Sequence, residues 1–363
     1  AMARAFICDS SYGEKIIEER DDIVPCLRCD KCHGAVCSVN PLIGRAQNLG
    51  KMYEPQAKGK KVAVIGGGPA GMRAALDAAK RGHKVTLYEK SDVLGGQLKH
   101  SDYVEWKWSL KNYKDYLIKE IKNSDVVLKL SHTPTKEELE KEGYDVVIAA
   151  CGAVPKKANI EGADDERIWA PIDCYGREDE LGENVVVIGG ASTGTETAAY
   201  LAEKGHKVTL ISRKPMIDYD NVAHGAEIFT EYVFGHENIT VITSANTLKI
   251  ENASEVTIEV SKGEGKRPMG GPFMPDKDDE ADIVDGEIKT LHADSVVFSA
   301  GVRPMSEECG RYAGAAPEFY VIGDANIHTN DMWKRFMLPD KAPKVGGDVL
   351  HATATAYAAA MNI

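Results

Sequence analysis

The chain has 363 residues, of which 43% are hydrophobic and 28% charged, a composition typical of soluble globular proteins with two or more domains. Its formal net charge of −12 disfavours a nucleic-acid or anionic-membrane partner. No apolar run approaches the roughly 20 residues that span a bilayer and no signal peptide opens the chain, so we expect a cytoplasmic protein.

The first 25 residues contain the stretch ARAFICDSSYGEKI, which begins abruptly with an apolar, strand-like run. Neither a cap nor a leader precedes this run. We therefore expect the chain to begin inside a larger protein.

Four of the eight cysteines lie within twelve residues, in the stretch CLRCDKCHGAVC, while the other four lie far apart in the sequence. Cysteines this close cannot all satisfy disulfide geometry, and disulfides are rare in a reducing compartment. A metal site is the better hypothesis. The spacing favours a [4Fe–4S] cluster, and a four-thiolate zinc site is the alternative. The candidate ligands are Cys26, Cys29, Cys32 and Cys37.

Residues 62–90, VAVIGGGPAGMRAALDAAKRGHKVTLYEK, predict a strand, a glycine turn, a helix and a second strand. Gly66, Gly68 and Gly71 form the pattern G-x-G-x-x-G. The first glycine permits the tight turn, the second lets the backbone approach a pyrophosphate, and the third lets helix and strand pack closely. Glu89 ends the second strand, where an acid binds ribose hydroxyls, so the segment predicts a dinucleotide site.

The same pattern recurs at 185–213, VVVIGGASTGTETAAYLAEKGHKVTLISR, at an offset of 123 residues and without a gap. Gly189 and Gly194 keep the first and third positions, while the methyl group of Ala191 narrows the pyrophosphate approach without closing it. The acid at the strand end is replaced by Ser212, Arg213 and Lys214. This run does not repel a 2′-phosphate and supplies cations for it, so we predict NADP(H) over NAD(H); ordinary surface charges are the alternative interpretation.

Several later segments predict strands that run into glycine turns, and two others predict helices. The strand-and-turn segments are VLGGQL (93–98), VVIAACGAVP (146–155), DSVVFSAGVRP (294–304) and YVIGDA (320–325). In the last of these, Asp324 follows Gly323 and places a carboxylate within reach of a ribityl hydroxyl. HATATAYAAAMNI (351–363) predicts a small-residue helix near a cofactor, although its alanines can also reflect helix propensity alone. WKWSLKNYKDYL (106–117) predicts an aromatic stripe in the core, with a cover over the flavin as the alternative, and 263–287 predicts an exposed loop.

Taken in order, these segments resemble the FAD/NAD(P)H half of the 2,4-dienoyl-CoA reductase and NADH:flavin oxidoreductase group, iron–sulfur members of the Old Yellow Enzyme family. The resemblance covers nearly the whole chain. Relatives place a [4Fe–4S] cluster here and follow its last ligand with CxVNP, which this chain matches as CSVNP at 37–41. The gaps before the third and fourth cysteines are shorter than is usual in the family, so the local loop must differ.

The resemblance implies a TIM barrel that carries FMN and precedes this chain, in cis or in trans. Residues 1–25 look like the final strand and helix of that barrel. Arg4 matches the arginine of a Gly-Arg pair that helps to hold the FMN phosphate, although Ala3 replaces the glycine. Electrons are then expected to pass from NAD(P)H through FAD and the cluster to FMN, which reduces an unsaturated substrate. Homo-oligomer formation is left open, and no catalytic residue is predicted.

The predicted fold class is α/β, with two Rossmann-like domains of the disulfide-reductase-like type. The predicted domains are a barrel remnant (1–25), an iron–sulfur segment (26–57), an FAD-binding domain (58–156 and 300–363) and an NAD(P)H-binding domain (157–299). The predicted FAD-binding residues are Gly66, Gly68, Pro69, Ala70, Gly71, Glu89, Lys90, Gly95, Gly96, Gln97, Gly152, Gly323 and Asp324. The predicted nicotinamide-binding residues are Gly189, Gly190, Ala191, Gly194, Ser212 and Arg213.

Two other functions remain open. By analogy with trimethylamine dehydrogenase, the chain could hold ADP in place of FAD and act as an electron-transfer or structural module; the glycine loop at 189–194 argues against this. A reductase resembling the small subunit of glutamate synthase is the other, and CSVNP argues against it. A thioredoxin-reductase mechanism is disfavoured because no closely spaced cysteine pair lies beside either glycine loop.

Overall fold

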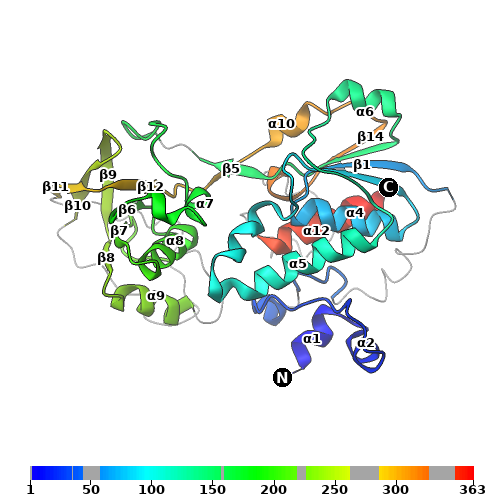
Figure 1. The fold of residues 1–363 in the computed structure, drawn as a ribbon, viewed down its shortest axis with the longest axis horizontal. Coiled ribbons are helices and arrows are strands. Elements are labelled where there is room, and N and C mark those ends of the chain that lie inside the picture. The colour runs from blue at the N-terminus through cyan, green and yellow to red at the C-terminus, as the bar shows by residue number, and fades with distance from the viewer. Residues whose placement is uncertain are drawn as a thin grey trace. The chain divides into compact units, whose positions relative to one another are not determined.

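The computed structural model describes residues 2–34, 36–43, 58–156, 159–218, 226–261, 286–326 and 348–363. The loop predicted at 263–287 lies outside the described residues except for its last two. The chain forms two compact units, Ala1–Val154 with Pro304–Ile363, and Pro155–Arg303 (Figure 1). Among the described helices, none combines the length and the apolar character needed to cross a membrane.

The first unit is built on a five-stranded sheet in the order β14-β4-β1-β2-β3, and all of its strand pairs are parallel. The strands are β1 (Lys61–Ile65), β2 (Lys84–Tyr88), β3 (Val127–Lys129), β4 (Val146–Ala149) and β14 (Glu318–Val321). One face is covered by α4 (Pro69–Lys80), α5 (Trp108–Asn123) and α12 (Val349–Asn362), the other by α6 (Lys136–Glu142) and α10 (Ser306–Gly310). Covered faces explain why β4 is apolar throughout.

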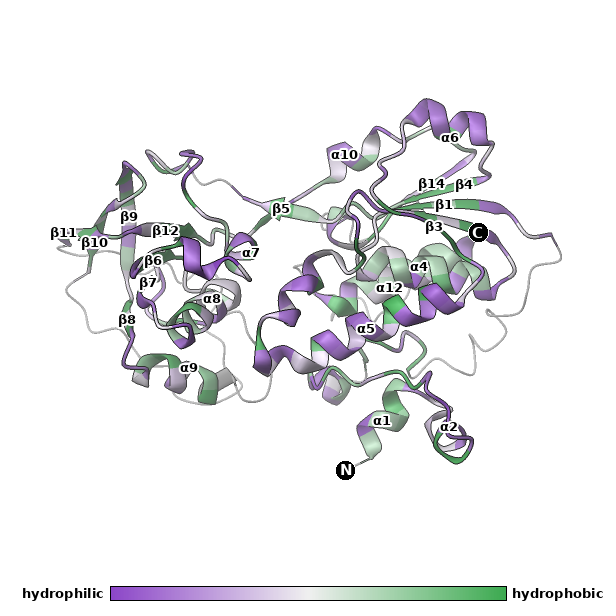
Figure 2. Cartoon of the chain, in the orientation of Figure 1, coloured by the Kyte–Doolittle hydropathy of each residue, from purple (hydrophilic) through white to green (hydrophobic). Residues whose placement is uncertain are grey.

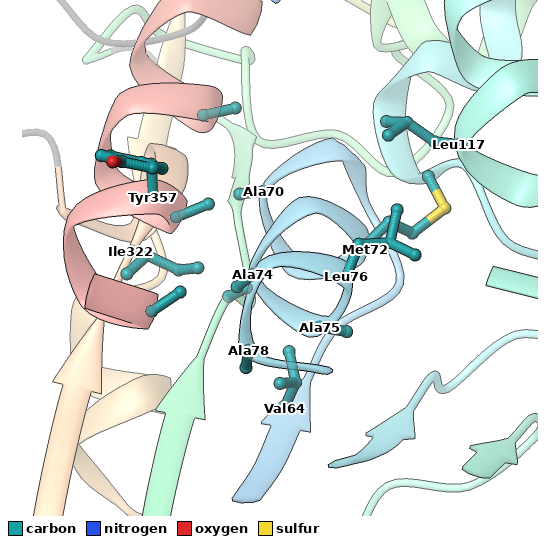
Figure 3. Close-up of a cluster of buried hydrophobic side chains, with 14 of the residues drawn as sticks. Val64, Ala70, Met72, Ala74, Ala75, Leu76, Ala78, Leu117, Ile322 and Tyr357 are labelled. Atoms are coloured by element: carbon teal, nitrogen blue, oxygen red, sulfur yellow. The ribbon is translucent and has the colours of Figure 1, made fainter. Parts of the chain in front are cut away.

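Helix α12 is the small-residue helix that the sequence predicts, and it packs against α4. Figure 3 shows Ala70, Ala74 and Ala78 of α4 turned toward α12, which contributes Tyr357. Small side chains let the two helix backbones approach closely. The buried guanidinium of Arg81 adds a hydrogen bond of 2.7 Å from Nη1 to the Ala360 carbonyl.

The aromatic stripe predicted for the core at 106–117 is only partly buried. Tyr113 and Leu117 of α5 are fully buried and belong to the same core as α4 and α12. Trp108, however, is 45% exposed, and the Arg28 guanidinium lies 4.8 Å from the centre of its ring. A helix buries only one stripe of its surface, so the prediction of a core position was wrong for Trp108.

The second unit contains a four-stranded parallel sheet in the order β12-β6-β7-β8 and a three-stranded antiparallel sheet in the order β11-β10-β9. The parallel strands are β6 (Asn184–Ile188), β7 (Lys207–Ile211), β8 (Ile239–Ile242) and β12 (Ser295–Phe298). The antiparallel strands are β9 (Ala245–Glu251), β10 (Glu255–Val260) and β11 (Glu287–His292). The helices are α7 (Pro171–Cys174), α8 (Ser192–Glu203) and α9 (Ala226–Gly235), and two short strands, β5 (Ala153–Pro155) and β13 (Val302–Pro304), pair separately. Parallel sheets with crossover helices in both units confirm the predicted fold class.

The first residues of the chain form two short helices, α1 (Ala3–Cys8) and α2 (Tyr12–Ile17). The prediction of a strand over α1 was therefore wrong in this structure. A helix satisfies its own backbone hydrogen bonds, whereas a strand needs a neighbouring strand to do so. The hydropathy colouring of Figure 2 shows that α1, at the edge of the first unit, is largely apolar.

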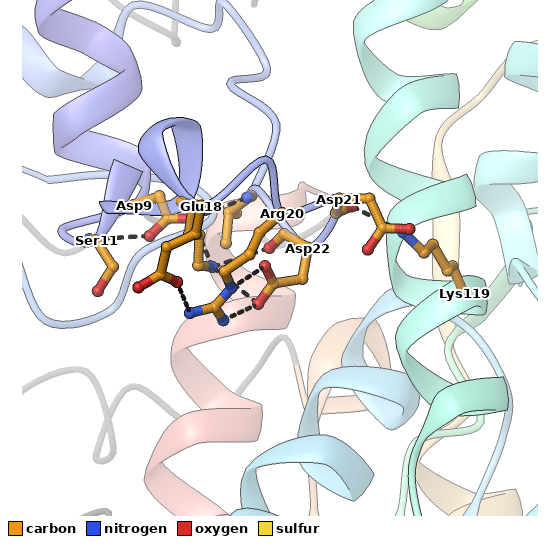
Figure 4. Close-up of polar contacts among 9 residues, drawn as sticks. Asp9, Ser11, Glu18, Arg20, Asp21, Asp22 and Lys119 are labelled. Carbon is orange, nitrogen blue, oxygen red and sulfur yellow. Dashed lines mark hydrogen bonds and ion pairs between the residues drawn. The ribbon is translucent and has the colours of Figure 1, made fainter. Parts of the chain in front are cut away.

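Polar contacts join this N-terminal segment to itself and to α5 (Figure 4). The buried carboxylate of Asp9 accepts bonds from Lys15 Nζ (2.8 Å), Val24 N (3.0 Å) and Ser11 N (3.1 Å). Lys119 of α5 reaches the Asp21 carbonyl at 2.8 Å. The Arg20 guanidinium beside Asp22 lowers the pKa of that carboxyl to about 2. The segment is thus ordered before the cysteines begin.

Candidate functional site

The first glycine loop joins β1 to α4, and a side chain would have a different effect at each of its three glycines. Gly66 has a φ of +111°, and a Cβ atom there would lie 2.3 Å from the Ala150 carbonyl oxygen. A Cβ on Gly71 would lie 1.8 Å from the Gly66 carbonyl oxygen. A Cβ on Gly68 would meet only the Gly96 Cα, at 3.8 Å. Packing therefore requires the first and third glycines, while the face of Gly68 is open for a ligand at the N-terminus of α4.

Two distant segments meet this loop. Gly95 N donates a 2.9 Å bond to the Gly67 carbonyl, and a Cβ on Gly96 would lie 2.8 Å from the Gly68 Cα. A Cβ on Gly323 would lie 2.8 Å from Ala70 Cβ, at the first turn of α4. The structure thus brings together the predicted FAD-binding segments 66–71, 95–97 and 323–324.

Helix α12 holds the third of these segments in place. Gly323 N donates to Thr355 Oγ1 at 2.9 Å, and His351 Nε2 donates to the Gly323 carbonyl at 3.0 Å. Both partners are buried. The side chain of Asp324, next along the chain, is partly exposed.

Glu89 follows β2 and is buried at the glycine loop. Its Oε2 accepts a 2.6 Å bond from Gly67 N, and its Oε1 accepts bonds from Ser91 N (2.9 Å) and Ser91 Oγ (2.6 Å). Lys90 is exposed beside it. Gln97 Nε2 donates to the Ala153 carbonyl at 2.9 Å, one residue after Gly152. The Glu89 carboxylate therefore shapes the glycine loop through both of its oxygens.

We expect Glu89→Ala to weaken FAD binding by about 1–3 kcal/mol, because charge-assisted bonds to the ribose and the bond to Gly67 N are both lost. Glu140→Ala on the exposed side of α6 is the matched control, and it should leave FAD affinity unchanged. Equilibrium dialysis of the apoprotein with FAD measures both. Equal FAD affinity in the two variants would remove Glu89 from the site.

The second glycine loop repeats this backbone geometry between β6 and α8. Gly189 has a φ of +118°, and a Cβ there would lie 2.1 Å from the Ser299 carbonyl oxygen. A Cβ on Gly194 would lie 1.8 Å from the Gly189 carbonyl oxygen, and Ala191 caps the N-terminus of α8 with extended backbone. The two glycine loops of the chain therefore have closely similar backbone geometry, which is the geometry that dinucleotide-binding loops use.

The residues after β7 are arranged differently from the prediction. Ser212 is fully buried, and its hydroxyl donates to the Met216 carbonyl at 2.8 Å. A Cβ on Gly190 would lie 2.5 Å from Ser212 Cβ, so Ser212 packs beneath the loop. Arg213, by contrast, is exposed. Of Ser212 and Arg213, only Arg213 has a side chain that is accessible to a ligand in this structure.

The four clustered cysteines line one pocket in the first unit. The pocket is lined by Arg4, Ile7, Cys8, Cys26, Leu27, Cys29, Asp30, Cys32, Cys37, Ser38 and Val39. Arg4 also pairs with Asp30 across 3.4 Å. Among the described residues, no three His, Cys, Asp or Glu side chains converge as a single metal ion would require. Four thiols that line one pocket are the donors that either a [4Fe–4S] cluster or a four-thiolate zinc site uses.

Each polar residue of the CSVNP stretch has a structural partner. Ser38 Oγ lies 3.1 Å from Cys29 Sγ, and Arg73 Nη1 of α4 donates to the Val39 carbonyl at 3.0 Å. Asn40 Nδ2 donates to the Ile7 carbonyl at 2.8 Å, while its Oδ1 accepts from Leu42 N at 3.0 Å. The last cysteine is therefore held between α1 and α4.

Cys8 is the residue of this pocket that the sequence did not reveal, since it lies 29 residues before Cys37. The structure places the two buried sulfur atoms 3.9 Å apart. A hydrogen bond from the Cys8 thiol lowers the pKa of Cys37, and weaker contributions in the same direction come from backbone hydrogen bonds of Val39 and Asn40. This favours the thiolate, the form of cysteine that binds metals.

Cys151 and Cys309 are also brought together, by the packing of α10 beside the end of β4. Met305 N donates to the Gly152 carbonyl at 3.0 Å, and the two thiols share a hydrogen bond that raises the pKa of Cys151. Both belong to the core on this face of the sheet, Cys309 fully buried and Cys151 partly so. Cys151 is therefore a packed residue of this core.

Comparison with known proteins places these features in context. Residues 60–333 match the family described as pyridine nucleotide-disulphide oxidoreductase. The chain is 30% identical over 344 residues to a cinnamate reductase of Clostridium sporogenes, covering 92% of this chain and 47% of that protein. It is 39% identical over 225 residues to an NADH oxidase of Thermoanaerobacter brockii, covering 58% of this chain and 34% of that protein.

The fold is also found in solved structures. A 2-naphthoyl-CoA reductase in complex with 2-naphthoyl-CoA superposes with a TM-score of 0.80 at 27% identity, covering 99% of this chain and 50% of that one. The chain thus spans about half the length of this structure and of the cinnamate reductase. These similarities confirm the resemblance inferred from the sequence.

Proposed function

Because this chain belongs to the pyridine nucleotide-disulphide oxidoreductase family, we propose that it is the NAD(P)H-oxidising portion of an Old Yellow Enzyme-like oxidoreductase. In this proposal electrons pass from NAD(P)H through FAD and a [4Fe–4S] cluster to an FMN-bearing TIM barrel that reduces an unsaturated substrate. The observation that carries the proposal is the presence, in one chain, of two glycine loops and a pocket lined by clustered cysteines.

FAD would be held in the first unit. The open face of Gly68 and the free N–H groups at the start of α4 suit a pyrophosphate, while Glu89 and Asp324 offer carboxylates to hydroxyl groups. Bound there, FAD supplies a carrier that accepts two electrons together and releases them singly. The buried hydrogen bond that Gly67 N donates to the Glu89 carboxylate fixes the loop before any ligand arrives.

The cluster would be held by Cys26, Cys29, Cys32 and Cys37. Ile7, Leu27 and Val39 give the pocket an apolar wall that limits the entry of water. The hydrogen bonds to the CSVNP stretch fix the backbone on which Cys37 sits. The short gaps between the cysteines are accommodated by left-handed backbone at Arg28 and Asp30, whose φ angles are +56° and +59°.

The partner proposed for this chain is the FMN barrel, in cis or in trans. Large apolar side chains are exposed over the first 17 residues, namely Met2, Phe6, Ile16 and Ile17. Neighbouring apolar side chains left in water are typical of an interface. The relatives, which are about twice as long as the aligned segment, leave room for such a domain.

The experiment that tests the proposal identifies what the chain binds. Anaerobically reconstituted protein should contain about four iron and four sulfide per chain, and its heat-released nucleotide should have the mass of FAD. Release of ADP or AMP instead would favour an electron-transfer module without nicotinamide activity. Stoichiometric zinc without sulfide would contradict the cluster.

We expect Arg213→Glu to weaken NADPH binding relative to NADH by about 1–3 kcal/mol, because an exposed cation that pairs with the 2′-phosphate becomes a repelling anion. Lys207→Glu is the matched control, since Lys207 is an exposed cation at the opposite end of β7, where it pairs with Glu183. Steady-state reduction of ferricyanide with each nucleotide measures the ratio. Equal use of NADH and NADPH by the unaltered chain would show that Arg213 does not recognise the phosphate.

A further inference from the structure

We propose that Cys8 is a fifth, non-ligating thiol of the iron–sulfur site, whose S–H group donates a hydrogen bond to Cys37 Sγ and raises the reduction potential of the cluster. This inference rests on the proposed function, because it takes Cys37 as a cluster ligand. Cys8 is a positioning residue in this scheme: it acts on the site through Cys37.

The geometry of the two thiols carries the inference. Cys8 Sγ lies 3.9 Å from Cys37 Sγ, both residues are buried, and both line the same pocket. The contact is not accidental packing of a loose end, because Cys8 ends α1 and Asn40 Nδ2 binds the carbonyl of the preceding Ile7 at 2.8 Å. The CSVNP stretch and the end of α1 are thus fixed to each other beside the sulfur pair.

The number of thiols determines which role is left for Cys8. A four-iron cluster takes one thiolate at each iron, and the clustered cysteines supply four. A fifth thiol can only displace one of them or remain protonated beside them. A thiol is a weak hydrogen-bond donor and a thiolate sulfur is an acceptor. At this distance the protonated Cys8 thiol can therefore donate a hydrogen bond to Cys37 Sγ.

The effect on the cluster follows from charge. Reduction adds one negative charge to the cluster and its ligand sulfurs, so a donor at a ligand sulfur stabilises the reduced state more than the oxidised one. The buried surroundings strengthen this interaction because little water competes with it. Removal of the donor should therefore shift the midpoint potential to more negative values.

The test compares Cys8→Ala with Cys8→Ser in the reconstituted full chain. The two replacements have nearly the same volume and differ in a hydroxyl that can donate to Cys37 Sγ. Cys174→Ala is the control, since it removes a buried thiol of the other unit whose Sγ bonds the Ala170 carbonyl. Iron and sulfide are counted for each, and the midpoint potential is measured by EPR-monitored redox titration without oxygen.

All three variants should assemble as much cluster as the unaltered chain. Cys8→Ala should have a lower potential than Cys8→Ser, and Cys174→Ala should have the potential of the unaltered chain. Equal potentials for Cys8→Ala and Cys8→Ser with full cluster would overturn this inference alone. Loss of iron in both Cys8 variants while Cys37→Ala retains it would also overturn it, because Cys8 would then be the ligand. An unaltered chain that assembles no cluster would overturn the proposed function as well.

Discussion

Gly71→Ala is expected to prevent the first unit from folding into a form that binds FAD. The added methyl group would lie 1.8 Å from the Gly66 carbonyl oxygen, and this oxygen is a backbone atom that cannot rotate away as the end of a side chain could. Relief of this clash requires α4 to move away from β1, and α4 carries much of the buried core. Overpacking of a core typically costs about 1–3 kcal/mol, and a backbone clash of this size should cost more.

Gly68→Ala is the matched replacement in the same loop, and it should separate folding from binding. Its methyl group would meet only the Gly96 Cα at 3.8 Å, which is ordinary contact, and its φ of −76° suits alanine. The unit should therefore fold, but the methyl group would occupy the face that we assign to the pyrophosphate. FAD affinity should fall at least tenfold, which corresponds to about 1.4 kcal/mol.

Circular dichroism melting and FAD titration measure the two effects separately. A folded, FAD-binding Gly71→Ala protein would contradict the packing that the structure assigns to the third glycine. Unchanged FAD affinity in Gly68→Ala would mean that the pyrophosphate does not approach the loop there. The effect of Gly71→Ala is expected in the second unit from Gly194→Ala, where the added methyl group would lie at the same 1.8 Å from the Gly189 carbonyl oxygen.

Cys32→Ala is expected to remove most of the iron and sulfide from the reconstituted chain. Cys32 lies in a single 3-10 turn, Lys31–Gly34, and lines the pocket without being fully buried. Its replacement should therefore leave the fold intact while one ligand is missing. Iron and sulfide should fall from about four each per chain to well below half of that, whereas FAD content should not change.

The control for this loss is Cys174→Ala, which removes a buried thiol that lies in the second unit and does not line the pocket. That variant should keep full iron and sulfide. If Cys32→Ala also keeps them, Cys32 is not a ligand and the assignment of the four cysteines fails. Colorimetric iron and sulfide assays, with FAD measured in the same samples, give the answer.

Local patterns in the sequence were sufficient for the fold class and for the two glycine loops. The reason is that the positive φ angles of Gly66 and Gly189 and the clashes at Gly71 and Gly194 arise within a strand, its turn and its helix, so that a short stretch of sequence records them. The small residues of α12 likewise predicted a closely packed helix, and α12 is buried against α4.

Contacts between distant segments were not accessible in the same way. Cys8 reaches Cys37 only because α1 packs beside the CSVNP stretch, and the sequence alone does not say that residues 3–8 form a helix. Ser212 was expected to face the nicotinamide cofactor, but the turn that follows β7 folds its hydroxyl onto the Met216 carbonyl. Arg213 beside it is exposed, and its role as a ligand of the 2′-phosphate stays a prediction.

The most direct test of the central claim is anaerobic addition of NADPH to the chain reconstituted with FAD, iron and sulfide. Flavin absorbance and the EPR signal of the cluster are followed in the same sample. We predict that the flavin is bleached first and that the signal of a reduced [4Fe–4S] cluster then appears. Enoates and enoyl-CoA esters should not be reduced, because that step is assigned to the FMN barrel. A flavin that stays oxidised under NADPH, or enoate reduction by this chain alone, would contradict the proposed function.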